Sequence, residues 1–286
     1  MSVSDPLIKE LKGHTLLLVE SSPNITDENP GLTAFCDCLE RILRCGVLAN
    51  ISSFGNFRPP DPWFWLEEMA EPKYQSLFSY QSSVEFAKSC SKVKTNRGRL
   101  RLLIRSCLAK RCMHIPVQLL IQCGEVRVYY SDKSIIGDGI LVEILLSVLM
   151  LTSKLQFKLD LRNSRFLDET WILPKTKYLQ FVPCNELGLT LAFVDGKALA
   201  ISVLPNSIAS EEDQIEVGDV LDELNSVPII PRVQGNLGSV LKKAAGLPVT
   251  AYIVKADLKG QIYFPLLPVL TQAGVDINQL KNKITG

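Results

Sequence analysis

The stretch from Lys92 to Arg111 constrains the fold most, because it combines a helical apolar period with a concentration of positive charge. The apolar residues recur at the spacing of one buried helix face, at Leu100, Leu103, Ile104, Cys107 and Leu108. Eight basic residues share the stretch, namely Lys92, Lys94, Arg97, Arg99, Arg101, Arg105, Lys110 and Arg111. No acidic residue occurs between Glu85 and Glu125. The pattern predicts a helix with one face in a core and a cationic row outside it.

The basic residues of this helix have two interpretations. Arg97, Arg101 and Arg105 are four residues apart and form one row along a helix. Such a row is often a solvated face whose aliphatic stems cover apolar surface. It can also be a docking surface for an acidic partner, because charge of one sign steers association. The candidate contacts are then Lys94, Arg97, Arg99, Arg101 and Arg105.

The overall charge balance argues against nucleic-acid binding. The chain has 286 residues with 31 Lys plus Arg and 30 Asp plus Glu, which leaves a formal net charge of +1. A nucleic-acid-binding domain is usually strongly basic. The cationic row is therefore a local feature, and its expected partner is another protein.

The sequence lacks the residue patterns of an enzyme or a metal site. Eight cysteines show no zinc spacing, and only His14 and His114 could add imidazole ligands. No GxSxG occurs, and neither Gly137-Asp-Gly139 nor Gly235-Asn-Leu-Gly238 is followed by the GK[ST] of a phosphate loop. We expect no catalytic residues, no metal and no cofactor.

The start of the chain and its apolar runs predict a cytoplasmic protein. The first ten residues are polar and charged, which is not the pattern of an export signal. The longest apolar run, Ile140 to Leu151, is too short to span a bilayer. We therefore expect reduced thiols and membrane association only through partners, on vesicles or organelles.

The first 165 residues read as an all-helical domain. Pro-started and capped helices are predicted after Asp5 and Asp61, and apolar residues recur at helical spacing from Leu32 to Leu48. We expect Trp63 and Trp65 to be core anchors. Ile140 to Leu151 is nearly all apolar and is predicted to be the central buried helix.

These helical segments carry the motifs of a known family. Leu39-Glu40, Ile42-Leu43 and Gly46 resemble the LE..L..G block that opens RUN domains, and Trp63 to Leu66 is similar to the FW..L block that follows. The segment Thr95 to Arg105 resembles the central T..GR.R...R helix, and Tyr129 to Leu159 resembles the closing blocks. The resemblance implies a binder of a small GTPase of the Rab, Rap or Arl type, or of a motor protein.

The second half changes from helical to strand-like patterns. Strands are predicted at 178–182, 189–194, 198–203, 220–224 and 249–254, with a short helix at 238–245. Asp195-Gly196 is typical of a hairpin turn between two of them. The predicted fold is thus multi-domain, α followed by α+β.

The second half resembles a PDZ domain. Glu186-Leu187-Gly188-Leu189 looks like its carboxylate-binding loop, and Gly218 to Leu221 followed by Asn225 is similar to its GD.L...N block. The resemblance implies a small β-sandwich or barrel with one or two helices. It also implies a peptide site at Leu187, Gly188, Leu189 and Ser239. We expect the helical domain at 1–165, a linker at 166–174, the PDZ-like domain at 175–258 and a C-terminal tail at 259–286.

Two residue choices at the implied peptide site leave its role open. Glu186 stands where the carboxylate loop usually begins with glycine, and an acid beside a carboxylate is unfavourable. Gly235 or Asn236 stands at the helix start, where many PDZ domains carry a histidine that reads the peptide. The module either pairs a peptide with a free strand edge or serves only as a packing and protein-interaction surface.

Overall fold

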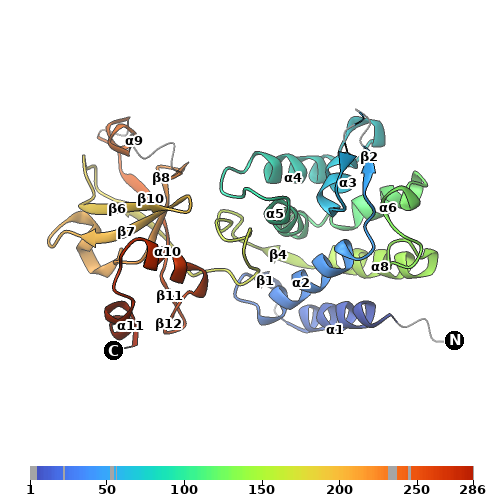
Figure 1. Ribbon diagram of the computed structural model, residues 1–286, viewed down its shortest axis with the longest axis horizontal. Helices are drawn as coiled ribbons and strands as arrows, with labels where there is room; N and C mark the ends of the chain where they lie inside the picture. Colours follow the sequence, from blue (N-terminus) through green and yellow to red (C-terminus); the bar gives the residue numbers. More distant parts are fainter. Residues whose placement is uncertain are drawn as a thin grey trace. The chain divides into compact units, whose positions relative to one another are not determined.

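The computed structural model describes residues 5–21, 23–51, 55, 57–230, 237–243 and 246–285. The chain divides into two compact units, Met1–Ile172 and Leu173–Gly286. Figure 1 shows helices dominating the first unit and strands dominating the second. Each unit is described by itself.

The helical unit is built from capped helices, most of which begin where the sequence predicts. Asp5, Asn29 and Asp61 each accept hydrogen bonds from the first turn of a helix that starts with proline. The longer helices are α1 (Pro6–Glu20), α2 (Pro30–Arg44), α4 (Phe78–Ser89), α5 (Asn96–Ala109), α6 (His114–Gln122) and α8 (Gly139–Thr152). The shorter ones are α3 (Pro62–Glu68), the 3-10 helix η1 (Pro72–Tyr74) and α7 (Val126–Tyr129).

Short strands interrupt the helices, so the expectation of an all-helical first half is wrong in detail. β1 (Asn24–Thr26) pairs in parallel with β4 (Gln156–Lys158), and β2 (Asn50–Ile51) pairs antiparallel with β3 (Phe57–Arg58). The β1–β4 pair joins the beginning of the unit to its end. Runs of two or three residues are too short for a strand period to be recognised in a sequence.

Aromatic residues fill the core of the helical unit. Trp63 and Trp65 are buried, as predicted. The indole Nε1 of Trp65 donates to the hydroxyl of Tyr130 at 2.9 Å, and that hydroxyl donates to the carbonyl of Leu43 at 2.6 Å. These two hydrogen bonds satisfy the indole N–H and the tyrosine hydroxyl, which would be unfavourable in the core without partners.

Helix α8 is not the central buried helix that its composition predicts. It buries Val142, Leu145, Val148 and Leu149, but Ile140 is 61% exposed and Met150 49%. A helix that is apolar all round is normally enclosed. In α8 the apolar side chains on one face instead lie at the surface.

The sheet-rich unit contains an open sheet rather than the predicted sandwich or barrel. Its strand order is β5-β10-β8-β7-β6, with β9 (Val227–Pro228) paired to β8, and within the described residues the end strands β5 and β6 are not paired with each other. The strands of the path are β5 (Thr176–Phe181), β6 (Leu189–Val194), β7 (Lys197–Val203), β8 (Val220–Leu224) and β10 (Val249–Val254). They match the predicted strands to within two residues, and Asp195-Gly196 forms the β6–β7 turn as predicted.

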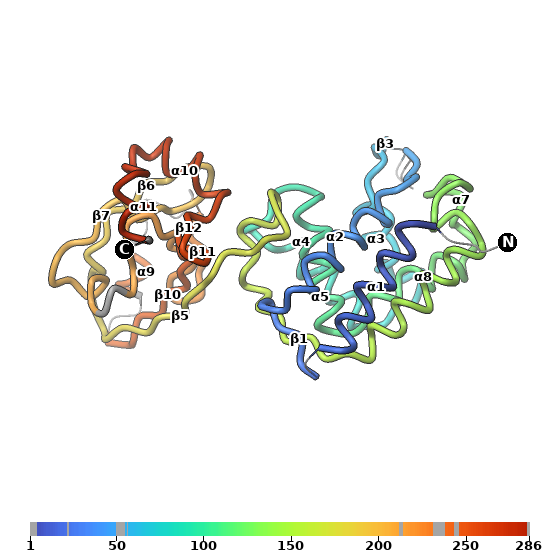
Figure 2. Tube along the Cα trace, turned by 90° about the horizontal axis from the view of Figure 1, so that it is seen from below, coloured from blue at the N-terminus to red at the C-terminus, as the bar shows by residue number. Residues whose placement is uncertain are grey.

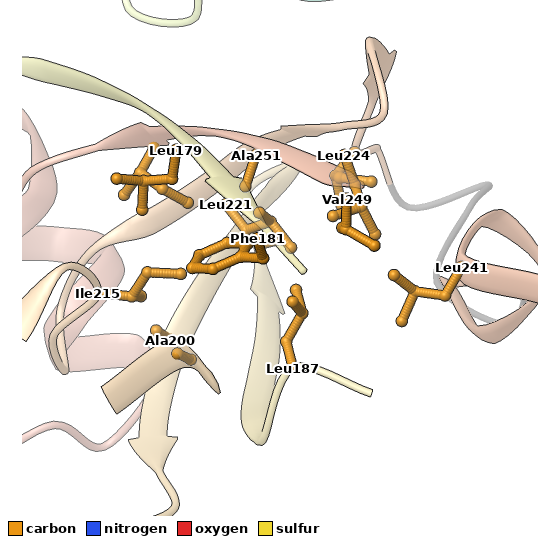
Figure 3. Close-up of a cluster of buried hydrophobic side chains, with 14 residues drawn as sticks. Leu179, Phe181, Leu187, Ala200, Ile215, Leu221, Leu224, Leu241, Val249 and Ala251 are labelled. Carbon is orange, nitrogen blue, oxygen red and sulfur yellow. The ribbon is translucent and has the colours of Figure 1, made fainter. Parts of the chain in front are cut away.

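The core of this unit lies on one face of the sheet. Phe181, Leu221 and Ala251 from three strands point toward Leu187 and Ile215 (Figure 3). Helix α9 (Leu237–Lys243) adds Leu241 to the same cluster. The 3-10 helix η2 (Ile208–Asp213) contributes Ala209, which is fully buried.

The C-terminal segment belongs to the sheet-rich unit. It forms the hairpin β11 (Asp257–Leu258) and β12 (Gln261–Ile262), the 3-10 helix η4 (Phe264–Leu266), and the helices α10 (Leu267–Gln272) and α11 (Ile277–Thr285). Leu266, Leu270 and Leu280 are buried, and Lys283 is paired with Glu216 at 2.9 Å. The packing of these apolar residues explains why the segment is not a free tail.

The boundary between the units lies between Ile172 and Leu173, near the end of the predicted linker. Residues 166–172 fall within the helical unit, where Phe166, Leu167 and Trp171 are buried. The expected linker at 166–174 is therefore wrong for most of its length. The sequence gives no strong periodicity over these few residues, so their packing could not be predicted.

We predict that replacing Leu280 by aspartate releases α11, because a buried methyl-bearing side chain becomes a charge without a partner. Trypsin should then cleave faster at Lys281 and Lys283, as followed by mass spectrometry of the full chain. Gln279→Ala, an exposed neighbour, should leave the cleavage rate unchanged. Equal cleavage of the Leu280→Asp variant and the wild type would show that α11 is not held by this contact.

Candidate functional site

Helix α5 begins at a capped turn that holds the segment around Asp168. The hydroxyl of Thr95 accepts from the backbone N–H of Gly98 at 3.0 Å. The Asp168 carboxylate accepts from the backbone N–H groups of Lys94 and Thr95, both at 2.9 Å, and from the Thr95 hydroxyl. A Cβ on Gly98 would lie 2.2 Å from Asp168 Oδ1. Glycine is required here because the later segment lies directly against the helix.

Arg101 points into the helical unit and not into solvent. Its side chain is 2% exposed; Nε donates to Glu40 Oε2 at 2.7 Å and Nη1 to the carbonyl of Leu167 at 3.0 Å. The guanidinium also lies 5.4 Å from the ring centroid of Trp171. A buried guanidinium is tolerated because a carboxylate, a carbonyl and an aromatic face surround it.

The carboxylate of Glu40 is the centre of this arrangement, and we call its donors and itself the Glu40 cluster. Arg44, Arg97, Arg101 and the Trp171 indole all donate to it, at 2.8, 3.2, 2.7 and 2.6 Å. Burial raises the pKa of Glu40, but hydrogen bonds from Arg101 and Arg44 outweigh it and hold the pKa below its ordinary value. Glu40 is thus a buried charge that is fully hydrogen-bonded.

Arg105 fastens the two ends of the helical unit together. Its Nη1 donates to Asp27 Oδ1 at 2.6 Å and its Nη2 to the carbonyl of Asp160 at 2.9 Å. The second oxygen of Asp27 accepts from the backbone N–H of Asp160 at 2.7 Å. These bonds lie directly after β1 and β4, so they support the strand pair.

The expected exposed row of arginines is therefore only partly present. Arg101 and Arg105 are buried at 2% and 3% exposure and bonded to this chain's own acceptors, so the prediction that they face a partner is wrong. Lys92, from the same stretch, is also buried and donates to the carbonyl of Arg162. The counterions of Arg101 and Arg105 are Glu40 and Asp27, which are far away in the sequence.

Three predicted residues remain at the surface and are called the α5 rim, namely Lys94, Arg97 and Arg99. Lys94 is exposed, the side chain of Arg97 is 56% exposed, and Arg99 is half-buried with Nη1 donating to Asn96 at 3.3 Å. Arg97 also donates to Glu40 from the edge of the Glu40 cluster. The rim thus presents positive charge beside a buried, fixed network.

The predicted peptide site of the second unit is partly assembled. Leu187 is buried in the core, whereas Leu189 begins β6, which is the edge strand of the sheet. Gly188 has φ +77°, and a Cβ on it would lie 2.3 Å from Ser207. The loop is anchored through the carbonyls of Leu187 and Gly188, which accept from Ala209 and Leu204 at 3.1 and 2.9 Å.

The other residues considered for the peptide site lie on α9, at the start of the loop, or outside the described residues. Ser239 lies half-buried on α9, and Glu186 is exposed at the start of the loop. Gly235 and Asn236, the residues predicted at the helix start, lie outside the described residues. Leu187, Gly188 and Leu189 are consecutive, so the loop and the start of β6 necessarily lie together. Ser239 lies on a separate element, α9.

A comparison with protein-family models decides the assignment of the helical unit. Residues 34–163 match the model of the RUN domain. The chain contains a RUN domain. The match includes Glu40, Gly98, Arg101 and Arg105, whereas Asp168 and Trp171 lie beyond its end. No curated protein matches the chain.

RUN domains are protein-interaction domains that generally bind small GTPases, which suggests a GTPase-interacting adaptor role in general. In the part of the chain that the structure describes, no group of three or more metal-ligating side chains is found. Over the same residues, no helix combines the length and the apolar character needed to cross a membrane. No family match covers the sheet-rich unit, so its resemblance to a PDZ domain rests on the sequence motifs alone.

Sequence reasoning missed the residues that hold α5 in place from distant parts of the chain. Glu40 was recognised only as part of a motif, and Asp27, Asp168 and Trp171 were not singled out at all. One signal was available: a run of eight cations with no acid between Glu85 and Glu125 needs distant acids if any of its members is buried. That signal does not identify which acidic residues are the counterions.

We predict that Gly98→Ala destabilises the helical unit by about 1–3 kcal/mol, because the added methyl displaces the Asp168 segment. The three tryptophans, 63, 65 and 171, all lie in the helical unit, so denaturation followed by tryptophan fluorescence reports on that unit. Gly13→Ala in α1, with no atom within 4 Å, is the matched control and should stabilise by about 0.5–1 kcal/mol. An unchanged midpoint for Gly98→Ala would contradict the close packing.

We predict that Glu40→Gln costs about 3–5 kcal/mol at neutral pH, because Arg101 would be left buried without its counterion. The folded pKa of Glu40 lies below the ordinary value of 4.5, so its contribution is full above pH 4.5 and is lost as pH falls through the folded pKa. The variant should therefore show a shallower loss of stability in acid by the same fluorescence assay. Glu20→Gln, at an exposed carboxylate, should keep the wild-type pH profile, and an identical profile for Glu40→Gln would rule out the linkage.

Proposed function

We propose that this protein is a non-enzymatic adaptor whose RUN domain binds a small GTPase of the Rab, Rap or Arl type, or a motor protein, in membrane trafficking or signalling. The observation that carries the proposal is the RUN domain at residues 34–163. The protein would be cytoplasmic and would reach vesicle or organelle membranes only through such partners.

The α5 rim is the proposed contact surface for that partner. Cations in the first turn of a helix oppose the helix dipole, so Arg97 and Arg99 do not stabilise α5 by position. Arg97 is partly compensated by Glu40, and Lys94 is exposed just before the cap. Positive charge that is unfavourable for its own helix and open to solvent is suited to an acidic partner surface.

Apart from Arg97, which also belongs to the α5 rim, the Glu40 cluster supports this surface without contacting the partner. It fixes the start of α5 against α2 through Arg97 and Arg101, and against the 166–171 segment through Leu167 and Trp171. Side chains on a rigid support lose less conformational entropy when they bind. Arg101 and Arg105 would thus stabilise the folded domain and would not contact the partner. Replacing them would change partner binding only by destabilising the domain.

We predict that Lys94→Glu combined with Arg97→Gln weakens GTPase binding at least tenfold while tryptophan fluorescence shows a folded helical unit. Binding would be measured by calorimetry against a panel of Rab, Rap and Arl proteins loaded with GDP or a GTP analogue. The matched control is Arg127→Gln combined with Lys133→Glu, at two exposed cations outside α5. Equal weakening by both pairs would mean nonspecific charge attraction, and unaltered binding by the first pair would remove the rim from the interface.

The alternative proposal is a peptide-binding scaffold that acts through the sheet-rich unit. It is supported by the edge position of β6 and by the loop of Leu187, Gly188 and Leu189 beside it. An extended peptide can add to such an edge through backbone hydrogen bonds. Ser239 on α9 would contact the peptide side chains.

We predict for this alternative that peptides with a free C-terminal carboxylate bind better than the same peptides with a C-terminal amide. A peptide array on the full chain measures the difference. Gly188→Val should abolish it, since φ +77° and the 2.3 Å approach to Ser207 exclude a branched side chain. Binding that ignores the terminal group would argue against carboxylate capture by this loop.

A further inference from the structure

A groove with an apolar lining lies between α1 and α8 in the helical unit. The two helices run side by side in Figures 1 and 2 and are in contact. The groove has a volume of about 480 Å³ and is lined by Lys12, Thr15, Leu16, Ile144, Ser147, Val148 and Leu151. We call it the α1–α8 groove; none of its residues belongs to the α5 rim.

The residues that border the groove recur at helical spacing on both sides. Along α1 they are Lys12, Thr15 and Leu16, and along α8 they are Ile144, Ser147, Val148 and Leu151. Leu16 is 56% and Leu151 39% exposed, and Ile140, Met150 and Val19 are exposed nearby. A single exposed leucine needs no explanation, but several exposed apolar side chains around a hollow are typical of a binding surface.

The two sides of the groove carry opposite charge. Lys12 lines it on the α1 side. Glu143 on α8 is exposed and lies one residue before Ile144 and four before Ser147, both of which line the groove. Within the described part of the chain neither Lys12 nor Glu143 takes part in an ion pair. Lys12 and Glu143 therefore place one positive and one negative charge on opposite sides of the groove.

We propose that the α1–α8 groove binds an amphipathic α-helix of a partner protein, with an acidic residue facing Lys12 and a basic residue facing Glu143. Leu16 on α1 and Ile144, Val148 and Leu151 on α8 give the groove its apolar lining, which suits a helix that presents apolar anchors at i, i+3, i+4 and i+7. The opposite charges on the two sides fix the direction in which that helix lies.

Two other occupants fit the geometry less well. A second copy related by two-fold symmetry would place the same hollow against itself, which leaves empty space where close contact is needed. A membrane surface attracts a convex apolar face with excess positive charge, whereas this surface is hollow and carries Glu143 on one side. A partner helix fills the hollow and pairs both charges.

The first experiment selects the occupant from a displayed library. Peptides of about 16 residues, built to be helical and randomised at apolar and charged positions, would be selected on the full chain. The proposal expects enrichment of apolar residues at i, i+3, i+4 and i+7 together with one acidic and one basic flank. Enrichment of extended or uncharged sequences, or no enrichment, would overturn it.

The variants place the selected peptide in the groove. Leu151→Glu should weaken the best peptide at least tenfold, and Val128→Glu, at an apolar residue that is 52% exposed outside the groove, should not. Lys12→Glu combined with Glu143→Lys should prefer the peptide whose acidic and basic residues are exchanged. Equal affinity of the selected peptide for wild type and Leu151→Glu would overturn the proposal, as would an unchanged charge preference.

The remaining measurements test the rival occupants and keep this groove distinct from GTPase binding. Light scattering that shows a wild-type dimer made monomeric by Leu151→Glu would assign the groove to a second copy. Cosedimentation with phosphatidylcholine and phosphatidylserine vesicles that Leu151→Glu abolishes would assign it to a membrane. Loss of GTPase binding in Leu151→Glu, with binding retained in the α5 rim variant, would assign it to the GTPase. Each result would overturn the partner-helix proposal.

Discussion

The buried carboxylate of Glu40 is the constraint on which the helical unit depends. A carboxylate at 2% exposure is unstable unless donors satisfy it. Four donors do so, and they come from α2, α5 and the segment that follows the RUN match. Because one acceptor joins three parts of the chain, the start of α5 and the 166–171 segment can take only one arrangement. The polar cluster therefore specifies geometry more than it adds stability.

The sheet-rich unit uses the same device at its own C-terminal end. Lys255 is buried and bonded to Asp219 and to Glu216, the latter at 3.0 Å, while Asp219 accepts from the backbone of Ala256 and Glu216. Burial raises the pKa of Asp219 above its ordinary value although Lys255 opposes this. Glu216 also pairs with Lys283, so α11 is tied to the sheet through the cluster. In both units a buried charge holds a late segment that carries little sequence signal of its own.

Helices and strands with a long apolar period could be predicted from the sequence, and long-range polar contacts could not. The start of α1, the strands β6 and β8 and the turn at Asp195 follow from local rules of capping, alternation and turn chemistry. The partners of Arg101 and Arg105 lie more than 50 residues away, and helical spacing says only that the two share a face. Spacing therefore identified the row but not whether it faced solvent or the core. For the same reason composition placed α8 at the centre, since it cannot show that one apolar face stays uncovered.

The division of one arginine row into buried and exposed members explains how a family motif and a binding surface can share a helix. Arg101 and Arg105 neutralise acids inside the fold, so they are invisible to a partner at any distance beyond direct contact. Lys94 and Arg97 stand one turn earlier, where the capped start of the helix meets solvent. Both side chains are exposed; the backbone N–H of Lys94 is held by Asp168, and the side chain of Arg97 is held by Glu40. A partner would thus meet a positively charged surface whose position is fixed before binding. Differences in affinity between partners would then depend on the exposed side chains alone.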